Sequence, residues 1–325
     1  MNKEKTLTQK KGLKMTSDGV QNLTIFLIFV VACIVGFALQ PDIFFGYTNI
    51  LNIFVNSSSV IMVGAAVTLV LISGNLDLSV GGVGAMGAVL FGLMSIAGIP
   101  VLLAALFSVL IGAAFGFLSG YSIAKFKLPS FIISLAFSYI CRGIALIGAG
   151  GAVVFNLPQD IGIIGQTVGG VPLPMVYALV AVVIFMIIQS KTTFGSKVYA
   201  VGSNMTSAKL SGINDKKVVS RVFMGSGMMA AFAGVVLTSR LAAADSGIFP
   251  ELHADCIIVA VLGGTDINGG RGTVFGMLIG ALFIAVLTNI MNMQGMTEYI
   301  QNVVRGVVLV LAILMNNIIR DRIRV

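Results

Sequence analysis

The apolar residues of this chain gather into long runs that short polar stretches separate. A helix needs about 20 apolar residues to cross the roughly 30 Å hydrocarbon core of a bilayer. An open sheet edge cannot satisfy its backbone groups in lipid, so each run is predicted to be a helix. The pattern therefore predicts an all-α, polytopic transmembrane bundle of about ten spans, of which the eighth is short: 23–39, 50–72, 79–98, 100–122, 130–148, 172–189, 218–240, 254–263, 273–291 and 297–316.

Basic residues indicate which ends of these spans face the cytoplasm, because Lys and Arg concentrate in cytoplasmic loops. They cluster in the N-terminal tail (Lys3, Lys5, Lys10, Lys11 and Lys14), between Lys191 and Arg221, and at the C-terminus (Arg320, Arg322 and Arg324), whereas 149–171 has none. With ten spans, this distribution predicts that both termini are cytoplasmic. The predicted parts are a cytoplasmic tail 1–22, a permease domain 23–316 that includes a cytoplasmic loop 190–217, and a cytoplasmic tail 317–325.

Composition supports a membrane protein. Of the 325 residues, 57% are hydrophobic and 10% are charged, with a mean hydropathy of +1.03, whereas soluble domains have roughly 45–50% apolar and about 25% charged residues. The net charge of +8 comes from short basic loops and ends, so nucleic acid is not an expected partner. Three scattered Cys and one His fit neither a disulfide framework nor a metal site. No P-loop motif is present, so this chain is predicted not to be a P-loop ATPase. No other enzymatic activity is predicted for it.

Glycines at four-residue spacing indicate close helix packing. Gly112, Gly116 and Gly120 fall on one face of the fourth predicted span, where small residues let another helix backbone approach. Packing roles are also predicted for Gly263, Gly264, Gly269 and Gly270. The stretch Gly74-x-x-Asp77 followed by Gly81-Gly82 is echoed by Gly263-x-x-Asp266 followed by Gly269-Gly270, as an internal repeat or by chance.

A polar cluster between two long apolar runs is the main candidate for the substrate pathway. It contains Asn75, Asp77 and Ser79, and its flanking glycines permit a broken backbone, which in transporters often lines the pathway. The alternative is that Asp77 caps the following helix at its N-terminus. Both roles are compatible.

Other charged residues have plainer interpretations. Arg142, Glu298 and Arg305 are expected to form a structural ion pair or to anchor at the interface rather than to contact substrate. Asp245, Glu251, His253 and Asp255 are expected in the last outer loop, where acidic residues suit docking of an extracytoplasmic partner; a metal site there is improbable.

The longest inner polar stretch, from Lys191 to Arg221, predicts a short surface helix. Ser203 or Asn204 can cap a helix that runs through Ala208 to Leu210, and Gly212 can end it. A helix of this kind suits the receipt of force from a soluble motor. A plain charged loop is the alternative.

Three stretches resemble the ribose-type sugar ABC permeases. The first is Gly74-Asn75-Leu76-Asp77-Leu78-Ser79-Val80-Gly81, and the second is the segment from Gly195 through Tyr199, Gly202, Asn204 and Ala208 to Ile213. The third is Val261-Leu262-Gly263-Gly264-Thr265, followed by Gly269-Gly270-x-Gly272. Their order and spacing match over roughly residues 45–316. The sequence departs from the family pattern at two places: Asn75-Leu76 replaces the pair usual before the aspartate, and Asp266 stands where relatives often carry Ser.

The resemblance implies an importer of a small sugar in a bacterial cell membrane. Its partners would be a second permease copy, an ABC-type ATPase that holds ATP and Mg²⁺, an extracytoplasmic sugar-binding protein and membrane lipid. The coupling helix would lie within 203–213, with Ser203, Asn204, Ala208, Lys209, Ser211 and Gly212. The competing hypothesis from the residues is a secondary transporter that couples ions through Asp77 and Asp255. No arrangement of catalytic residues supports a lipid enzyme.

Overall fold

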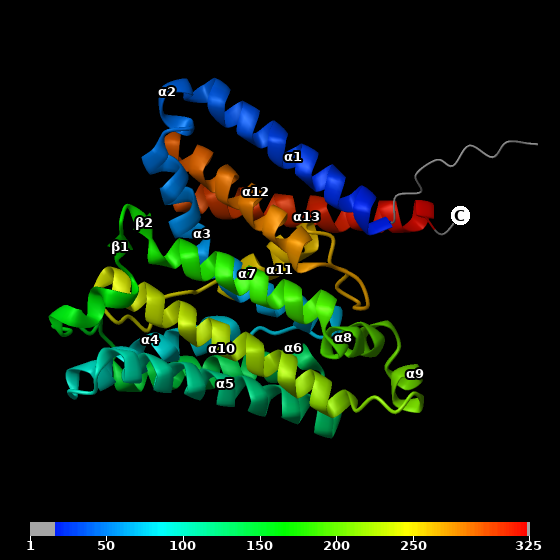
Figure 1. The fold of residues 1–325 in the computed structure, drawn as a ribbon, viewed down its shortest axis with the longest axis horizontal. Helices are drawn as coiled ribbons and strands as arrows, with labels where there is room; N and C mark the ends of the chain where they lie inside the picture. The colour runs from blue at the N-terminus through cyan, green and yellow to red at the C-terminus, as the bar shows by residue number, and fades with distance from the viewer. Residues whose placement is uncertain (1–16, 324–325) are drawn as a thin grey trace, which may run out of the picture.

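The computed structural model describes residues 17–323 and is mostly helical (Figure 1). Every predicted span coincides with a helix. The elements are α1 (Ser17–Leu39), α2 (Pro41–Phe44), α3 (Tyr47–Ile72), α4 (Val80–Ile96), α5 (Val101–Phe126), α6 (Ser130–Gly148), the 3₁₀ helix η1 (Gln159–Ile164), β1 (Thr167–Val168), β2 (Val171–Pro172), α7 (Leu173–Lys191), α8 (Thr193–Ser203), α9 (Met205–Leu210), α10 (Asp215–Leu241), α11 (Leu252–Leu262), α12 (Val274–Met293) and α13 (Glu298–Ile323).

Within the described residues, six helices are long and apolar enough to cross a membrane on their own: α3, α5, α6, α7, α10 and α12. Two of the remaining helices are shorter. α4 has 17 residues, and α11, which corresponds to the short eighth span that the sequence predicted, has 11; at 1.5 Å per residue α11 is about 16 Å long. Each of these two helices follows a non-helical segment, 73–79 before α4 and 242–251 before α11.

The two broken segments meet inside the bundle. A methyl group added at Gly81, in the first turn of α4, would lie 2.7 Å from the carbonyl oxygen of Phe249 and 3.9 Å from His253 Nδ1, in the first turn of α11. The helices α4 and α11 therefore begin close to one another, each after an extended segment. Broken helices of this kind occur at membrane depth only where protein or a cavity surrounds the exposed backbone.

Close backbone contact holds α5 against α10. A methyl group at Gly112 would lie 2.3 Å from Ala231 Cβ, one at Gly116 would lie 2.3 Å from the Phe223 carbonyl oxygen, and one at Gly120 would lie 2.7 Å from Phe223 Cβ. Only hydrogen fits at these three positions, which is how small residues bring membrane helices together.

The outer surface of the bundle is apolar. Large side chains on α5, α6 and α13 are strongly exposed, among them Leu102 at 68%, Ile147 at 84% and Tyr299 at 83%. The buried core centres on α3, whose residues 61–72 are all buried. An apolar exterior on this scale requires an apolar solvent, which a bilayer supplies.

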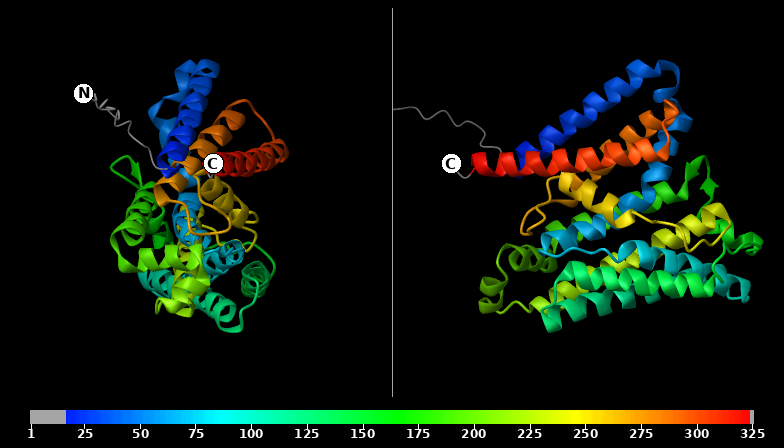
Figure 2. Two further views of the ribbon diagram at one scale, coloured as in Figure 1. Left: turned by 90° about the vertical axis from the view of Figure 1, so that its right-hand side faces the viewer. Right: turned by 180° about the vertical axis from the view of Figure 1, so that it is seen from behind.

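The first and last helices of the described residues share one end of the bundle. α1 begins and α13 ends at the same end as α8 and α9, whereas η1 and the small antiparallel pair of β1 and β2 lie at the opposite end (Figures 1 and 2). The tail 317–325 was predicted as a separate part, but α13 continues through it to Ile323. Helix α1 begins at Ser17, ahead of the predicted start, and the lysines from Lys3 to Lys14 lie outside the described residues.

Candidate functional site

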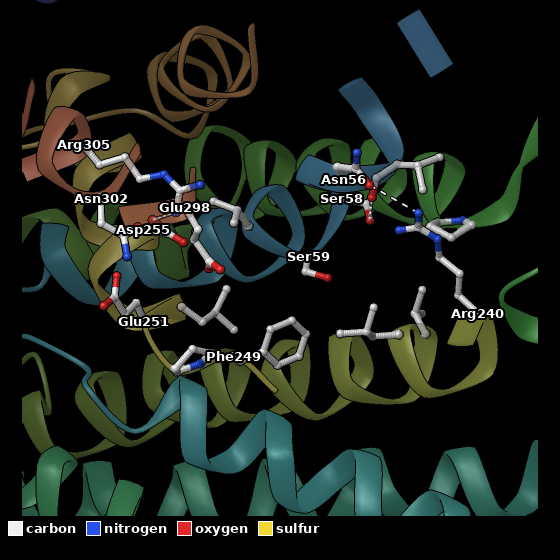
Figure 3. Close-up of a pocket in the computed structure, with 17 residues that line it drawn as sticks. Asn56, Ser58, Ser59, Arg240, Phe249, Glu251, Asp255, Glu298, Asn302 and Arg305 are labelled. Carbon is white, nitrogen blue, oxygen red and sulfur yellow. Dashed lines mark hydrogen bonds and ion pairs between the residues drawn. The ribbon is translucent and has the colours of Figure 1, made fainter. Parts of the chain in front are cut away.

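A cavity of about 410 Å³ lies between α3, α10, α11 and α13 (Figure 3). This volume falls within the roughly 300–1,000 Å³ of ordinary ligand pockets. The polar side chains come from four helices and the 242–251 loop that precedes α11, which Figure 3 shows facing a common space. They are Asn56, Ser58, Ser59, Arg240, Glu251, Asp255, Glu298, Asn302 and Arg305.

The charges around this cavity are nearly balanced, with two arginines and three carboxylates among its described lining residues. Arg305 pairs with Asp255 at 3.7 Å, and Arg240 Nη2 donates a hydrogen bond to Asn56 Oδ1 at 3.3 Å. Glu298 lines the cavity but is not the ion-pair partner of Arg305. The cavity thus offers both donors and acceptors, with one aromatic face, that of Phe249.

A second cavity of about 140 Å³ adjoins the first, since Asn56, Val60, Asp255 and Arg305 line both. It extends between α3 and α12, where Asn49 and Asn289 exchange hydrogen bonds of 3.1 and 2.8 Å. The Asp255–Arg305 pair therefore lies at the boundary between two polar spaces.

Phe249 and its loop separate the larger cavity from α4. The backbone of Phe249 is left-handed, with φ of 57°. This conformation is uncommon for a bulky residue and costs about 1 kcal/mol or more. Arg142 from α6 fixes this conformation, donating to the carbonyl oxygens of Ser246 at 2.9 Å and of Ile248 and Phe249 at 3.2 Å. A methyl group at Gly84 would lie 2.9 Å from the Phe249 ring, so the ring rests on α4.

Asp77 lies on the α4 side of this loop, in the extended segment 73–79, and its side chain is completely buried. Its Oδ1 accepts hydrogen bonds from the Ser79 backbone N–H at 2.9 Å and from the Ser79 hydroxyl at 2.6 Å. Oδ2 has no hydrogen-bond partner among the described residues, and neither has the Ser226 hydroxyl of α10. Ser79, rather than Asp77, is the N-cap of α4, so Asp77 stabilises the turn just before the helix.

Serines of α6 satisfy the extended segment around Asp77. Ser130 accepts a hydrogen bond from the Leu76 backbone N–H at 3.0 Å, and Ser134 accepts one from Leu78 at 3.0 Å. Ser134 also donates to the Leu76 carbonyl oxygen at 3.2 Å. The predicted pathway residues Asn75, Asp77 and Ser79 are all buried here and do not line the 410 Å³ cavity. Their role in transport remains a prediction.

Three stretches that are distant in sequence meet in a glycine junction at the end of the bundle near α8. The glycine junction consists of Gly74, Gly202, Gly269 and Gly270. Gly270 N–H donates to the carbonyl oxygen of Ile72 at 2.8 Å. A methyl group at Gly202 would lie 1.7 Å from that same oxygen, and one at Gly269 would lie 2.6 Å from Gly74 Cα.

Gln189 of α7 ties the same region to α12. Its Oε1 accepts from the Val274 N–H at 2.9 Å, and its Nε2 donates to the Gly272 carbonyl oxygen at 3.0 Å. The Tyr199 hydroxyl of α8 donates to that carbonyl at 2.6 Å. The end of α8, the segment before α4 and the loop before α12 are thus joined backbone to backbone.

The helix α9 projects beyond this junction (Figure 1). Asn204 is its N-cap and accepts from the Ser207 N–H at 2.9 Å, whereas Ser203 is the last residue of α8. Ala208 is buried and Lys209 pairs with Asp215 at 3.1 Å. Leu210, in contrast, is 86% exposed.

The α9 helix ends in a left-handed turn. The Ser211 hydroxyl donates to the Ser207 carbonyl oxygen at 3.0 Å, and Gly212 follows with φ of 78°. A left-handed residue directly after a helix is the usual reason for glycine at that position.

Comparison with known proteins agrees with this architecture. The model of a protein family described as "Branched-chain amino acid transport system / permease component" matches residues 49–313. The chain belongs to this permease family. The ribose import permease protein RbsC of Bacillus subtilis is 34% identical over 322 residues, covering 97% of this chain and 98% of its own. The D-allose transport system permease protein AlsC of Escherichia coli is 33% identical over 300 residues, covering 91% of each chain.

A more distant relative is the fructose import permease protein FruG of Bifidobacterium longum, 28% identical over 323 residues, which cover 96% of this chain and 94% of its own. No solved structure gives a significant match. The chain is accordingly a multi-pass membrane protein and a transport permease rather than an enzyme.

One sequence interpretation is wrong in this permease. His253 and Asp255 were expected in an outer loop, but they lie in the first turn of α11, and Asp255 lines the cavity. The structural roles expected for Arg142 and Arg305 agree with the structure, although Arg305 pairs with Asp255 and Arg142 supports the 242–251 loop. Sequence reasoning missed Asn56, Ser58, Ser59 and Arg240 as well. The run of four polar residues from Asn56 to Ser59 inside an apolar helix was the available signal.

Proposed function

We propose that this permease is the membrane-spanning subunit of an ATP-driven, binding-protein-dependent importer for a small sugar. The observation that carries the proposal is the 410 Å³ cavity, which combines donors, acceptors and one aromatic face at the centre of a permease fold. A neutral polyhydroxylated solute needs alternating donors and acceptors, and an aromatic ring can cover the apolar face of a sugar. Relatives named for ribose, allose and fructose support the same substrate class.

We infer that substrate enters this cavity and leaves past the break before α4. The ring of Phe249 separates the two regions, so inward passage requires the 242–251 loop to move. Asn75, Asp77 and Ser79 lie beyond it and are proposed as the inner part of the pathway. Transporters place substrate sites at broken helices in this way.

The energy for movement is proposed to enter through α9. Ser203, Asn204, Ala208, Lys209, Ser211 and Gly212 form or flank this helix, and they are proposed as the ATPase coupling element. Leu210, 86% exposed on this helix, is the apolar side chain that a docked ATPase is proposed to cover. The glycine junction links α8 directly to the segment that carries Asp77. A displacement of α9 would therefore be transmitted through α8 to that segment over a short distance.

The membrane arrangement proposed here keeps ten crossings with both termini in the cytoplasm. Two crossings are composite: segment 73–79 with α4, and segment 242–251 with α11. The shared position of the start of α1, the end of α13 and the basic α8–α9 region at one end of the bundle supports this arrangement (Figure 1). Residues 23–316 would form the permease domain, 190–217 its cytoplasmic loop, and 1–22 and 317–325 the tails of a bacterial cell-membrane protein.

Partner subunits follow from the importer class. An ABC-type ATPase would bind ATP and Mg²⁺ and receive α9, a second permease copy would complete the pathway, and an extracytoplasmic sugar-binding protein would deliver substrate. This chain itself would hold no cofactor.

Reconstitution tests the proposal. Uptake of radiolabelled sugar into proteoliposomes should require the ATPase, ATP and the binding protein together, and amino acids should not compete. Uptake by the chain alone under a proton or sodium gradient would instead establish ion-coupled transport through Asp77 and Asp255.

A further inference from the structure

A small basic cavity lies where α8 and α10 begin. Its volume is about 140 Å³, and the residues that line it are Thr193, Phe194, Lys197, Asn214, Lys217, Val218 and Arg221. No carboxylate is among these described lining residues. Three cations, all with exposed side chains, therefore line one small cleft that is open to the surroundings.

No carboxylate forms a salt bridge with these cations among the described residues. Lys197, Lys217 and Arg221 take part in neither the Lys209–Asp215 pair nor the Arg305–Asp255 pair. The carboxylate nearest in sequence, Asp215, is buried and pairs with Lys209 at 3.1 Å on the α9 side. Like charges held close together repel one another, so the cavity favours an anion that can accept from all three.

The remaining lining suits an anion of phosphate type at a membrane surface. Thr193 contributes a hydroxyl, and Asn214, whose Oδ1 already accepts from the Lys217 N–H at 3.1 Å, has its amide NH₂ free to donate. Phe194 and Val218 give the cavity an apolar side. Phosphate oxygens accept several charge-assisted hydrogen bonds at once.

Position distinguishes a lipid phosphate from a partner's carboxylate. The cavity adjoins the ends of α7 and α10, two helices long enough to cross the bilayer, whereas α9 extends farther from them (Figure 1). The exposed apolar contact for a soluble partner is Leu210 on α9, which is not part of the cavity. On the proposed topology, on which this inference rests, the cavity lies at the level of the inner-leaflet headgroups, where anionic lipids meet basic pockets.

We propose that this basic cavity binds the phosphate group of an anionic phospholipid of the cytoplasmic leaflet. The full-length chain, purified and placed in nanodiscs that contain spin-labelled phosphatidylglycerol or spin-labelled phosphatidylcholine, tests this directly. The motionally restricted fraction should be larger for phosphatidylglycerol. Lys217→Gln should weaken that preference roughly fivefold, the effect of about 1 kcal/mol per cation, and Lys197→Gln should act alike.

The chain offers a matched control. Lys216 is exposed, carries the same charge and precedes Lys217 on α10, but it does not line the cavity. Lys216→Gln should leave the lipid preference near the wild-type value. If Lys216→Gln and Lys217→Gln lowered the preference for phosphatidylglycerol equally, that preference would come from general surface charge. The proposal would then be overturned.

Competition experiments distinguish a lipid phosphate from the other anions that could fill this cavity. Glycerol phosphate or inorganic phosphate that released the labelled lipid at millimolar concentration would assign the cavity to a soluble phosphate, and release on addition of the ATPase would assign it to a partner carboxylate. Either result overturns the lipid assignment. Labelling of a cysteine placed at Lys216 reports sidedness separately: an external site would refute the proposed topology, whereas an internal site without lipid preference would refute this inference alone.

Discussion

The substitution Gly202→Ala gives the sharpest test of the glycine junction. A methyl group at this position would lie 1.7 Å from the Ile72 carbonyl oxygen and 2.7 Å from the Gly270 nitrogen. Both atoms are backbone, so no side-chain rotation can relieve the overlap. The Gly270 N–H···O=C Ile72 hydrogen bond of 2.8 Å has to open to admit the methyl group.

Two effects of opposite sign decide the magnitude. Gly202 lies in α8, where alanine gains about 1 kcal/mol over glycine in helix propensity. Overpacking costs about 1–3 kcal/mol, and separation of a buried hydrogen-bonded pair costs about 1–3 kcal/mol more. The overlap wins, and the expected net destabilisation is about 3 kcal/mol.

Two measurements follow in the same preparation. The melting midpoint of the detergent-solubilised variant should fall by roughly 5 °C or more, and ATP-driven uptake in proteoliposomes should be lost at temperatures where the variant remains folded. Gly143→Ala is the matched control, because nothing lies within 4 Å of a methyl group there and α6 gains helix propensity. If the two alanine variants melted and transported alike, the junction would not be the tight backbone contact inferred here.

Three further variants probe the other parts of the site. Asp77→Asn keeps an acceptor for the turn and adds a donor toward Ser226, so the melting temperature should be unchanged or higher. Sugar uptake should nevertheless fall at least tenfold. Normal uptake would show that Asp77 only stabilises the turn before α4. Leu210→Ser should weaken ATPase binding about 10–100-fold by loss of about 1.5–3 kcal/mol of leucine burial, measured by surface plasmon resonance, whereas Thr206→Ser should not. Arg142→Gln removes three hydrogen bonds to the 246–249 segment, so hydrogen exchange there should rise and uptake should fall; unchanged exchange would show that the loop holds itself.

Hydropathy located the ten longer apolar helices, because burial in lipid requires long apolar runs, but it did not predict α2, η1 or α8. The same signal could not show how the non-helical segments before α4 and α11 pack. Segment 242–251 contains Asp245, Gly247, Pro250 and Glu251, so the sequence predicts a break between two spans there. What the sequence does not reveal is that this break is packed within the bundle, where Arg142 donates hydrogen bonds to its carbonyl oxygens.

Local chemistry was predictable where one short stretch contained all the partners. Asn204 and Gly212 delimit α9 through contacts within a few residues, and capping signals of this kind can be found in a sequence. The cavity could not be predicted, because its lining comes from positions between Asn56 and Arg305 that only tertiary packing brings together. The same holds for the basic cavity, where Lys197 and Lys217 come from different helices.

One helix, α6, supports both non-helical segments, and its sequence contains the pattern. Ser130, Ser134, Ser138 and Arg142 recur every four residues along α6, which places them on one face. Ser130 and Ser134 satisfy the backbone before α4, and Arg142 satisfies the backbone before α11. At Ser138 the α6 backbone comes so close to α4 that a methyl group at Gly82 would lie 2.2 Å from its carbonyl oxygen.

Unsatisfied backbone groups are costly at membrane depth, so the two breaks persist only while this face of α6 stays in register with them. A small shift of α6 relative to α4 would exchange partners at both breaks at once. The cavity proposed for substrate and the buried Asp77 lie on either side of the loop that Arg142 holds, so we expect α6 to connect the two ends of the proposed pathway.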